Sequence, residues 1–193
     1  MISSPARRLV PPGAYGGPVT DERGDDAERR EFTGALDKHR RLLVRTLRGI
    51  SDEQARLRPT VSALCLGGLI KHITTMEESW SNFITEGTTA MGGAGADAAT
   101  TASSFSATFE MTDDETVAVL LERYRERARA TDELIMTLPS LGISHPLPDA
   151  PWFEQGASWS ARRVLMHVIA ETAQHAGHAD IIRETIDGAK SMG

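Results

Sequence analysis

The chain has little cysteine, no long apolar run and no excess of positive charge. Its 193 residues include a single cysteine, Cys65, which excludes an intramolecular disulfide and suits a reducing cytosol. No apolar run approaches the roughly 20 residues of a membrane span, and the start of the sequence lacks the apolar core of a signal peptide. The net charge of −6 argues against nucleic acid as the main partner. We therefore expect a cytoplasmic protein that binds neither membrane nor nucleic acid.

The sequence is long enough for one domain with a sizeable core. Residues 1–24 are rich in proline and glycine and carry few large apolar side chains. A segment of this composition cannot bury enough apolar surface to offset the entropy lost on ordering. We therefore predict a disordered N-terminal tail over residues 1–24 and a single domain over residues 25–193.

Apolar residues recur at helical spacing in four stretches, and strand-like alternation of useful length is not found. Acidic residues at Asp25 and Asp26 suit the positive end of a helix dipole, and Thr112 with Glu115 has the spacing of a capping box. Ser51 is placed to cap a single helical turn between the first two long helices. The predicted long helices cover residues 25–49, 64–86, 112–138 and 158–187. The last of them is expected to open at Ser158 or Ser160 and to end near Gly188.

A long connection separates the second and third predicted helices. Residues 87–108 are almost entirely Gly, Ala, Thr, Ser and Met, without helical or strand period. Such a connection is unusual unless it crosses the length of a domain, which for a helix of about 20 residues is on the order of 30 Å. The sequence therefore predicts an all-α four-helix bundle with a long crossover, helices two and three parallel and helices one and two antiparallel.

The most informative motif lies in the fourth predicted helix. Glu171, His175 and His178 are spaced by four and three residues, so they share one face of a helix. His72 lies beside the apolar stripe of the second predicted helix. Facing helices about 8–10 Å apart could bring His72 to Glu171 and His175. Two imidazoles and a carboxylate suit a divalent ion and leave coordination positions open for water or substrate.

Spacing alone leaves other interpretations open. A histidine on an apolar face, such as His72, is more often a hydrogen-bonded core residue than a metal ligand. The Glu171 and His175 pair has the spacing of a surface i,i+4 pair, which contributes about 0.2–0.5 kcal/mol. The first helix carries a basic patch that could take an anionic substrate or form a solvated face paired with nearby acids. The patch consists of Lys38, His39, Arg40, Arg41, Arg45 and Arg48.

Three further residues have competing roles. His178 could replace Glu171 as a ligand, act as a base, or bond to Asp180 or Glu184. Asp180 is a candidate to orient one of the metal-binding side chains without contacting the metal itself. His167, one turn before Glu171, could orient that carboxylate or pack under the loop over residues 140–158.

Taken together, these residues resemble the DinB/YfiT-like superfamily of four-helix metal-binding proteins, most closely its mini-circle-protein-like branch. The resemblance covers roughly residues 30–188. It is carried by the segments 49–59, 69–80 and 159–184, of which the last is the longest and most specific. The resemblance implies an up-down-down-up bundle, often a homodimer, with a three-ligand divalent metal site.

Many members of that superfamily carry histidine where this chain has Glu171. The mycothiol-dependent maleylpyruvate isomerase branch uses His, Glu and His, which implies His72, Glu171 and His175 as ligands of zinc or nickel. The implied function is a thiol-dependent S-transferase or isomerase, in which a metal-bound thiolate from a low-molecular-weight thiol attacks a small electrophile. The alternative is a non-catalytic, stress-related metal-binding protein, which His178 would favour if it completed a four-ligand structural site.

Overall fold

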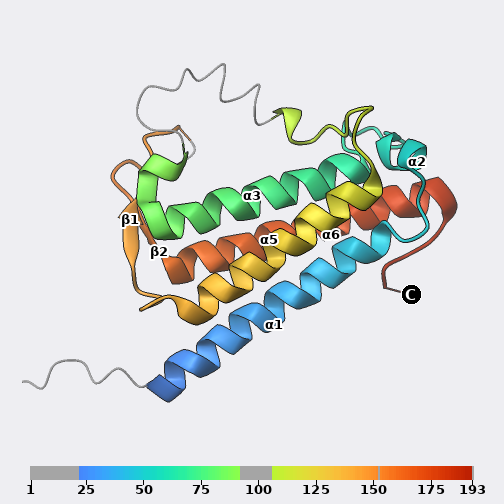
Figure 1. Ribbon diagram of the computed structural model, residues 1–193. Helices are drawn as coiled ribbons and strands as arrows, with labels where there is room; N and C mark the ends of the chain where they lie inside the picture. Colours follow the sequence, from blue (N-terminus) through green and yellow to red (C-terminus); the bar gives the residue numbers. More distant parts are fainter. Residues whose placement is uncertain (1–21, 92–105, 152, 193) are drawn as a thin grey trace, which may run out of the picture.

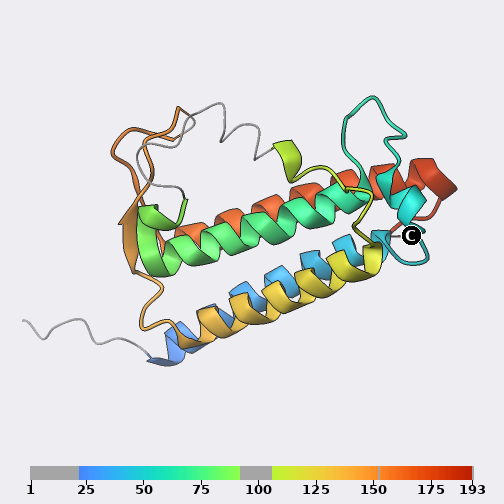
Figure 2. The same cartoon turned by 45° about the horizontal axis from the view of Figure 1, so that its top comes forward.

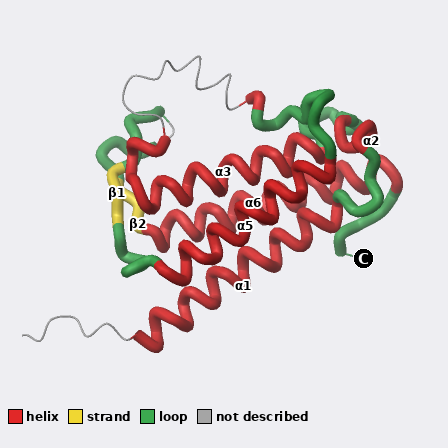
Figure 3. Tube along the Cα trace, in the orientation of Figure 1, coloured by secondary structure: helices red, strands yellow, loops and turns green. Residues whose placement is uncertain are grey.

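In the computed structural model, the described residues are 22–91, 106–151 and 153–192, and most of them are helical. The long helices are α1 (Glu22–Thr46), α3 (Leu66–Glu86), α5 (Val117–Thr137) and α6 (Ala161–Asp187). The short elements are α2 (Asp52–Arg56), the 3₁₀ helix η1 (Gly87–Met91), β1 (Ser144–Pro146) and β2 (Ser158–Ser160). Figure 3 shows the two strands as one small hairpin at one end of the helices.

The four long helices form the expected bundle. Figure 1 shows α3 and α5 running in one direction and α1 and α6 in the other, which is the predicted up-down-down-up order. Helix α1 packs against α6 and α5, and α3 packs against the same two helices from the opposite side. In Figure 2, α1 and α5 accordingly lie together on the side away from α3 and α6. None of the helices in the described part of the chain is long and apolar enough to cross a membrane.

The apolar core is divided into two clusters with a polar level between them. The polar level includes Arg40, Glu77, Thr131 and Thr172, all of which are buried. One apolar cluster lies toward α2 and includes Leu43, Leu69, Tyr124 and Ile182. The other lies toward the hairpin and includes Leu36, Phe83, Ile135 and Leu165.

Several helix boundaries follow the predicted capping residues. Ser51 and Gln54 form a capping box at the start of α2, and the Ser160 hydroxyl accepts a hydrogen bond from Arg163 N–H at the start of α6. Gly188 ends α6 in the left-handed region at φ 76°, which glycine adopts without steric cost. These local signals were sufficient to place both elements.

Other predictions differ from the structure. Helix α5 begins after Thr116, whose hydroxyl caps Val119 N–H, and the predicted cap at Thr112 is wrong. Glu115 does accept a hydrogen bond from Thr112 N–H, but this pair closes a turn before the helix. The hairpin was not predicted, because its strands are too short to show an alternation of polar and apolar residues. The paired residues run from Ser144↔Ser160 to Pro146↔Ser158.

The predicted tail and crossover fall largely outside the description. Residues 1–21 of the tail are not among the described residues, and α1 begins at Glu22, so residues 22–24 are helical. The first residues of the predicted crossover, residues 87–91, form the 3₁₀ helix η1. Residues 92–105 of the crossover lie outside the described ranges.

Candidate metal centre

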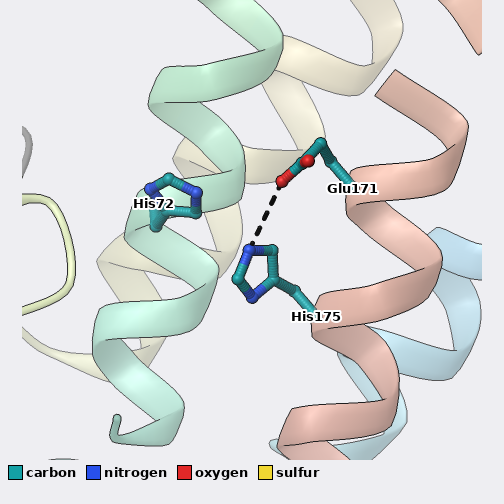
Figure 4. Close-up of side chains that lie close together, drawn as sticks. All are labelled: His72, Glu171 and His175. Atoms are coloured by element: carbon teal, nitrogen blue, oxygen red, sulfur yellow. Dashed lines mark ion pairs between the residues drawn. The ribbon is translucent and has the colours of Figure 1, made fainter. Parts of the chain in front are cut away.

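Helices α3 and α6 bring together the three residues predicted as ligands. His72 lies in the second turn of α3, and Glu171 and His175 lie one turn apart on α6. One ligand atom from each of the three lies within 4.8 Å of the others. Figure 4 shows Glu171 and His175 extending from α6 toward His72, with the contact of 3.5 Å between His175 Nε2 and Glu171 Oε2 dashed. The structure therefore assembles a His, Glu, His group from residues about a hundred positions apart.

Burial keeps both imidazoles neutral near pH 7. His72 is 3% exposed, and its burial, with repulsion from His175, lowers its pKa to about 4. The pKa of His175 is also lowered, mainly by burial, although the nearby Glu171 carboxylate opposes that shift. A neutral imidazole offers a nitrogen lone pair to a metal ion, so the electrostatics of the site suit ligation.

The outer side of His72 contacts the segment that leads into α5. His72 Nδ1 lies 3.0 Å from the Thr108 hydroxyl oxygen. The Phe109 ring stacks on His72 with centroids 3.8 Å apart at 19°, and lies 5.8 Å from the His175 ring. Thr108 and Phe109 therefore hold the His72 imidazole from the side opposite α6.

Two glycines of α3 allow this close approach. A Cβ at Gly68 would lie 1.8 Å from the Phe109 carbonyl oxygen, and one at Gly67 would lie 2.2 Å from Met111 Sδ. Sequence analysis missed Thr108 and Phe109, because they belong to a segment without period. The Gly67 and Gly68 pair inside an otherwise apolar helix is the signal that could have indicated a closely packed backbone there.

His178 lies next to the group but is not part of it. Its Nδ1 is 3.4 Å from His175 Nδ1, whereas Glu171 faces His175 Nε2. Among the described residues, the set of mutually close ligand atoms contains His72, Glu171 and His175 without His178. The geometry thus places His178 within reach of a ligand rather than in the ligand set.

The carboxylates proposed to partner His178 have other contacts. Asp180 accepts a hydrogen bond of 2.6 Å from Ser191 N–H, and Glu184 pairs with Lys190 Nζ at 2.9 Å. Within the described chain, these contacts direct Asp180 and Glu184 toward the C-terminal segment. The suggested role of Asp180 in orienting a ligand stays a prediction.

His167 packs against tryptophans. Its ring centroid lies 4.9 Å from that of Trp80 and 5.3 Å from that of Trp159, and the two indoles stack on each other at 5.0 Å. Burial lowers the pKa of His167, and the charge of Glu171 opposes this shift. The contacts of the His167 ring with Trp80 and Trp159 are observed, and its suggested role in orienting Glu171 stays a prediction. The tryptophans and His167 form an aromatic wall on the hairpin side of Glu171.

Cys65 is buried at the start of α3, as expected for a packing residue. Its sulfur accepts a hydrogen bond of 3.3 Å from Gly68 N–H and so caps the helix. The thiol is engaged in the fold and lies away from solvent. A reaction of this protein with a thiol therefore requires a thiol from elsewhere.

The donor set of two neutral imidazoles and one carboxylate fits a divalent metal ion. An up-down-down-up bundle with this group between two antiparallel helices defines the DinB/YfiT-like class of helical proteins. The family model described as Mycothiol-S-transferase matches residues 31–188, and the chain belongs to this family. No curated protein is significantly similar to the chain.

Proposed function

We propose that this protein is a metal-dependent S-transferase that joins a low-molecular-weight thiol of the mycothiol type to a small electrophile. The observation that carries the proposal is the convergence of His72, Glu171 and His175, whose ligand atoms lie within 4.8 Å, in a chain of the mycothiol S-transferase family. Zinc and nickel are the proposed ions, because imidazole and carboxylate donors suit both. The homodimer and the cytoplasmic location expected from the sequence stay predictions.

The proposed role of each side chain at the metal site follows from its contacts and its burial. A divalent ion at this site would supply Lewis acidity that lowers the pKa of a thiol. His72 and His175 would hold that ion as neutral donors, and Glu171 would add the one negative charge of the set. Thr108 would keep His72 in its orientation through the contact at Nδ1.

His178 is the proposed proton acceptor. It is half-buried, lies outside the ligand set, and is close enough to His175 to reach a substrate held beside that residue. An imidazole has one ring nitrogen that can accept a proton and one that can donate it, so it can act as a general base. Because Cys65 is buried and caps α3, the attacking sulfur belongs to the co-substrate.

The electrophile would lie against the aromatic wall of Trp80, Trp159 and His167. These rings pack against one another on the hairpin side of Glu171, where Trp80 is buried and Trp159 and His167 are half-buried. Flat apolar surfaces with a few polar edges are typical of small-molecule sites. Trp152, in the loop over residues 140–158, lies outside the described residues.

A structural ion is the second candidate function. The observation in its favour is that His72 is 3% exposed and covered by Phe109. A site closed on that side would hold an ion that stabilises the bundle without catalysis. The two candidates differ in whether the metal-loaded protein binds a thiol.

Elemental analysis of untagged protein tests the site. We expect close to one equivalent of zinc or nickel in the wild type and in the control His39→Ala, and loss of the metal in His175→Ala. The purified, metal-loaded protein is then titrated with mycothiol, bacillithiol and glutathione by calorimetry. Saturable binding of one thiol supports the transferase, and metal binding without thiol binding supports the structural ion. A wild type that takes up no metal on reconstitution contradicts both candidates.

A further inference from the structure

We propose that the groove between α1 and α5 binds a compact polyvalent oxyanion, such as a phosphate ester or a polycarboxylate. The groove has a volume of about 330 Å³. The proposed metal centre lies between α3 and α6, on the other side of the bundle (Figure 2). The groove is therefore separate from the site of the proposed transfer reaction.

The lining of the groove is strongly basic in an acidic protein. It contains six arginines against two aspartates, Asp37 and Asp132, while the whole chain has a net charge of −6. Residues spaced by three and four positions share a helix face, so the arginines of each helix line up along the groove. The arginines are Arg40, Arg41 and Arg45 from α1, Arg48 from the turn that follows α1, and Arg125 and Arg129 from α5.

The outer arginines are available to a ligand. Arg41 pairs with Asp37, and both side chains are more than half exposed, so water screens this pair. Arg129 lies 3.5 Å from the exposed Glu122. Arg48 makes no side-chain hydrogen bond or ion pair with the described residues. Guanidinium groups in such settings can turn to bind the oxygens of an oxyanion in a bidentate manner.

The floor of the groove carries buried polar atoms that point to a ligand independently of the surface charge. Tyr124 is 1% exposed and Arg40 is 6% exposed, and both line the groove. Tyr124 Oη and Arg40 Nε have no hydrogen-bond partner among the described residues. Buried tyrosine hydroxyls and guanidinium N–H groups normally find such partners. An oxyanion oxygen at the floor would accept hydrogen bonds from both.

The remaining contacts of Arg40 hold this floor in place. Its guanidinium bonds to the Glu77 carboxylate and, at 2.8 Å, to Asp132 Oδ1. Those two acids pair both terminal guanidinium nitrogens, so Nε is the nitrogen of this side chain without a partner among the described residues. Val44 and Ala128 add a short apolar stretch beside it. The groove can therefore take a small organic anion with a compact carbon skeleton.

The size and charge of the groove select the ligand class. A volume of about 330 Å³ is near the lower limit for small-molecule pockets, typically about 300–1,000 Å³. Several arginines on two facing helices favour an anion with more than one charged group over a monovalent one. Phosphate esters and polycarboxylates share this chemistry.

Calorimetric titration of the full chain with inorganic pyrophosphate and with citrate tests the proposal. We expect saturable binding of at least one, and which of them binds distinguishes phosphate from carboxylate recognition. The double variant Arg48→Gln/Arg129→Gln should raise the Kd about tenfold or more, because two charge-assisted contacts are lost. Tyr124→Phe, which removes only the hydroxyl, should raise the Kd by a smaller factor.

The matched control is Arg30→Gln/Arg123→Gln. It removes the same charge from exposed residues of the same two helices, outside the groove lining. We expect the control and His175→Ala to bind the anion like the wild type. The proposal is overturned if neither anion saturates the protein, or if the two double variants weaken binding equally. If folded His175→Ala lost anion binding, the claim that the groove and the metal centre are separate sites would be wrong. If His175→Ala lost the metal but bound the anion like the wild type, the two sites would be independent.

Discussion

His72 Nδ1 lies 3.0 Å from Thr108 Oγ1, and this contact joins α3 to the segment that leads into α5. On its other side, His72 offers a ring nitrogen to the group that it forms with Glu171 and His175. The stacked ring of Phe109 restricts rotation of the imidazole. The orientation of one candidate ligand is thus set by a residue that is neither on its own helix nor on α6.

Removing the Thr108 hydroxyl is expected to weaken metal binding. Thr108→Val keeps the shape of the side chain but removes the oxygen that contacts His72, so the ring loses its orientation. Loss of such supporting contacts typically lowers metal affinity by about 10–100-fold. Thr108→Ser should retain most of the affinity. Competition with a chromogenic chelator measures the effect, with Thr137→Val, on an exposed helix face, as the control. Equal affinities of Thr108→Val and wild type would rule out the orienting role.

The stability of the metal-free protein is expected to fall as the pH decreases from about 6.5 to about 4. The pKa of His72 is about 4 in the folded state against an ordinary value near 6.5, so the unfolded chain binds the proton first. The loss amounts to a few kcal/mol, at about 1.4 kcal/mol per pH unit, and the lowered pKa of His175 adds to it in the same direction. Below about pH 4 the His72 contribution is constant.

Urea unfolding in the presence of a chelator, at several pH values, checks this expectation. His72→Gln should flatten the dependence between pH 6.5 and 4, and His39→Gln should leave it unchanged. A wild type and a His72→Gln variant with parallel pH profiles would contradict the assignment.

Much of the architecture could be predicted because it depends on local periodicity. Apolar residues at helical spacing predicted the four long helices, and Ser51 and Ser160 marked the starts of α2 and α6. The spacing of four between Glu171 and His175 guarantees that they share a helix face. Their proximity to His72 could be predicted, because all three residues were expected to face inward on helices that pack together. The structure confirms that His72, Glu171 and His175 converge. That they bind a metal stays a prediction.

What could not be predicted depends on contacts between distant segments. Thr108 and Phe109 lie in a stretch without periodicity, and only tertiary packing brings them onto His72. The three-residue strands of the hairpin are too short to be seen in a pattern. Glu77 lies on the buried face of the amphipathic helix α3, where Arg40 of α1 pairs with it. The spacing along α3 does not show which side chain of a distant segment it meets.

Breaking the buried pair of Arg40 and Glu77 is expected to be strongly destabilising. Both side chains lie in the interior. Removing Arg40 leaves the Glu77 carboxylate without its ion-pair partner, and removing Glu77 leaves buried Arg40 with the half-exposed Asp132 alone. Glu77→Leu and Arg40→Met should each lower the free energy of unfolding by about 3–5 kcal/mol. The double variant should lose less than the sum of the two, because neither charge is then left alone. Urea unfolding of the wild type, the two single variants and the double variant gives the coupling free energy of the pair. If the losses of the two single variants add up to that of the double variant, the pair does not act as a unit.

Two glycine substitutions in helices should have opposite effects. A Cβ at Gly68 would lie 1.8 Å from the carbonyl oxygen of Phe109, so Gly68→Ala must displace the segment that covers His72. We expect a loss of about 1–3 kcal/mol in the free energy of unfolding, with weaker metal binding because Thr108 moves with that segment. A Cβ at Gly177 of α6 would meet no neighbouring segment or side chain within 4 Å, so Gly177→Ala should stabilise the helix by about 0.5–1 kcal/mol. Urea unfolding and chelator competition measure both properties, and a Gly68→Ala protein as stable as Gly177→Ala would show that the segment is not held against α3.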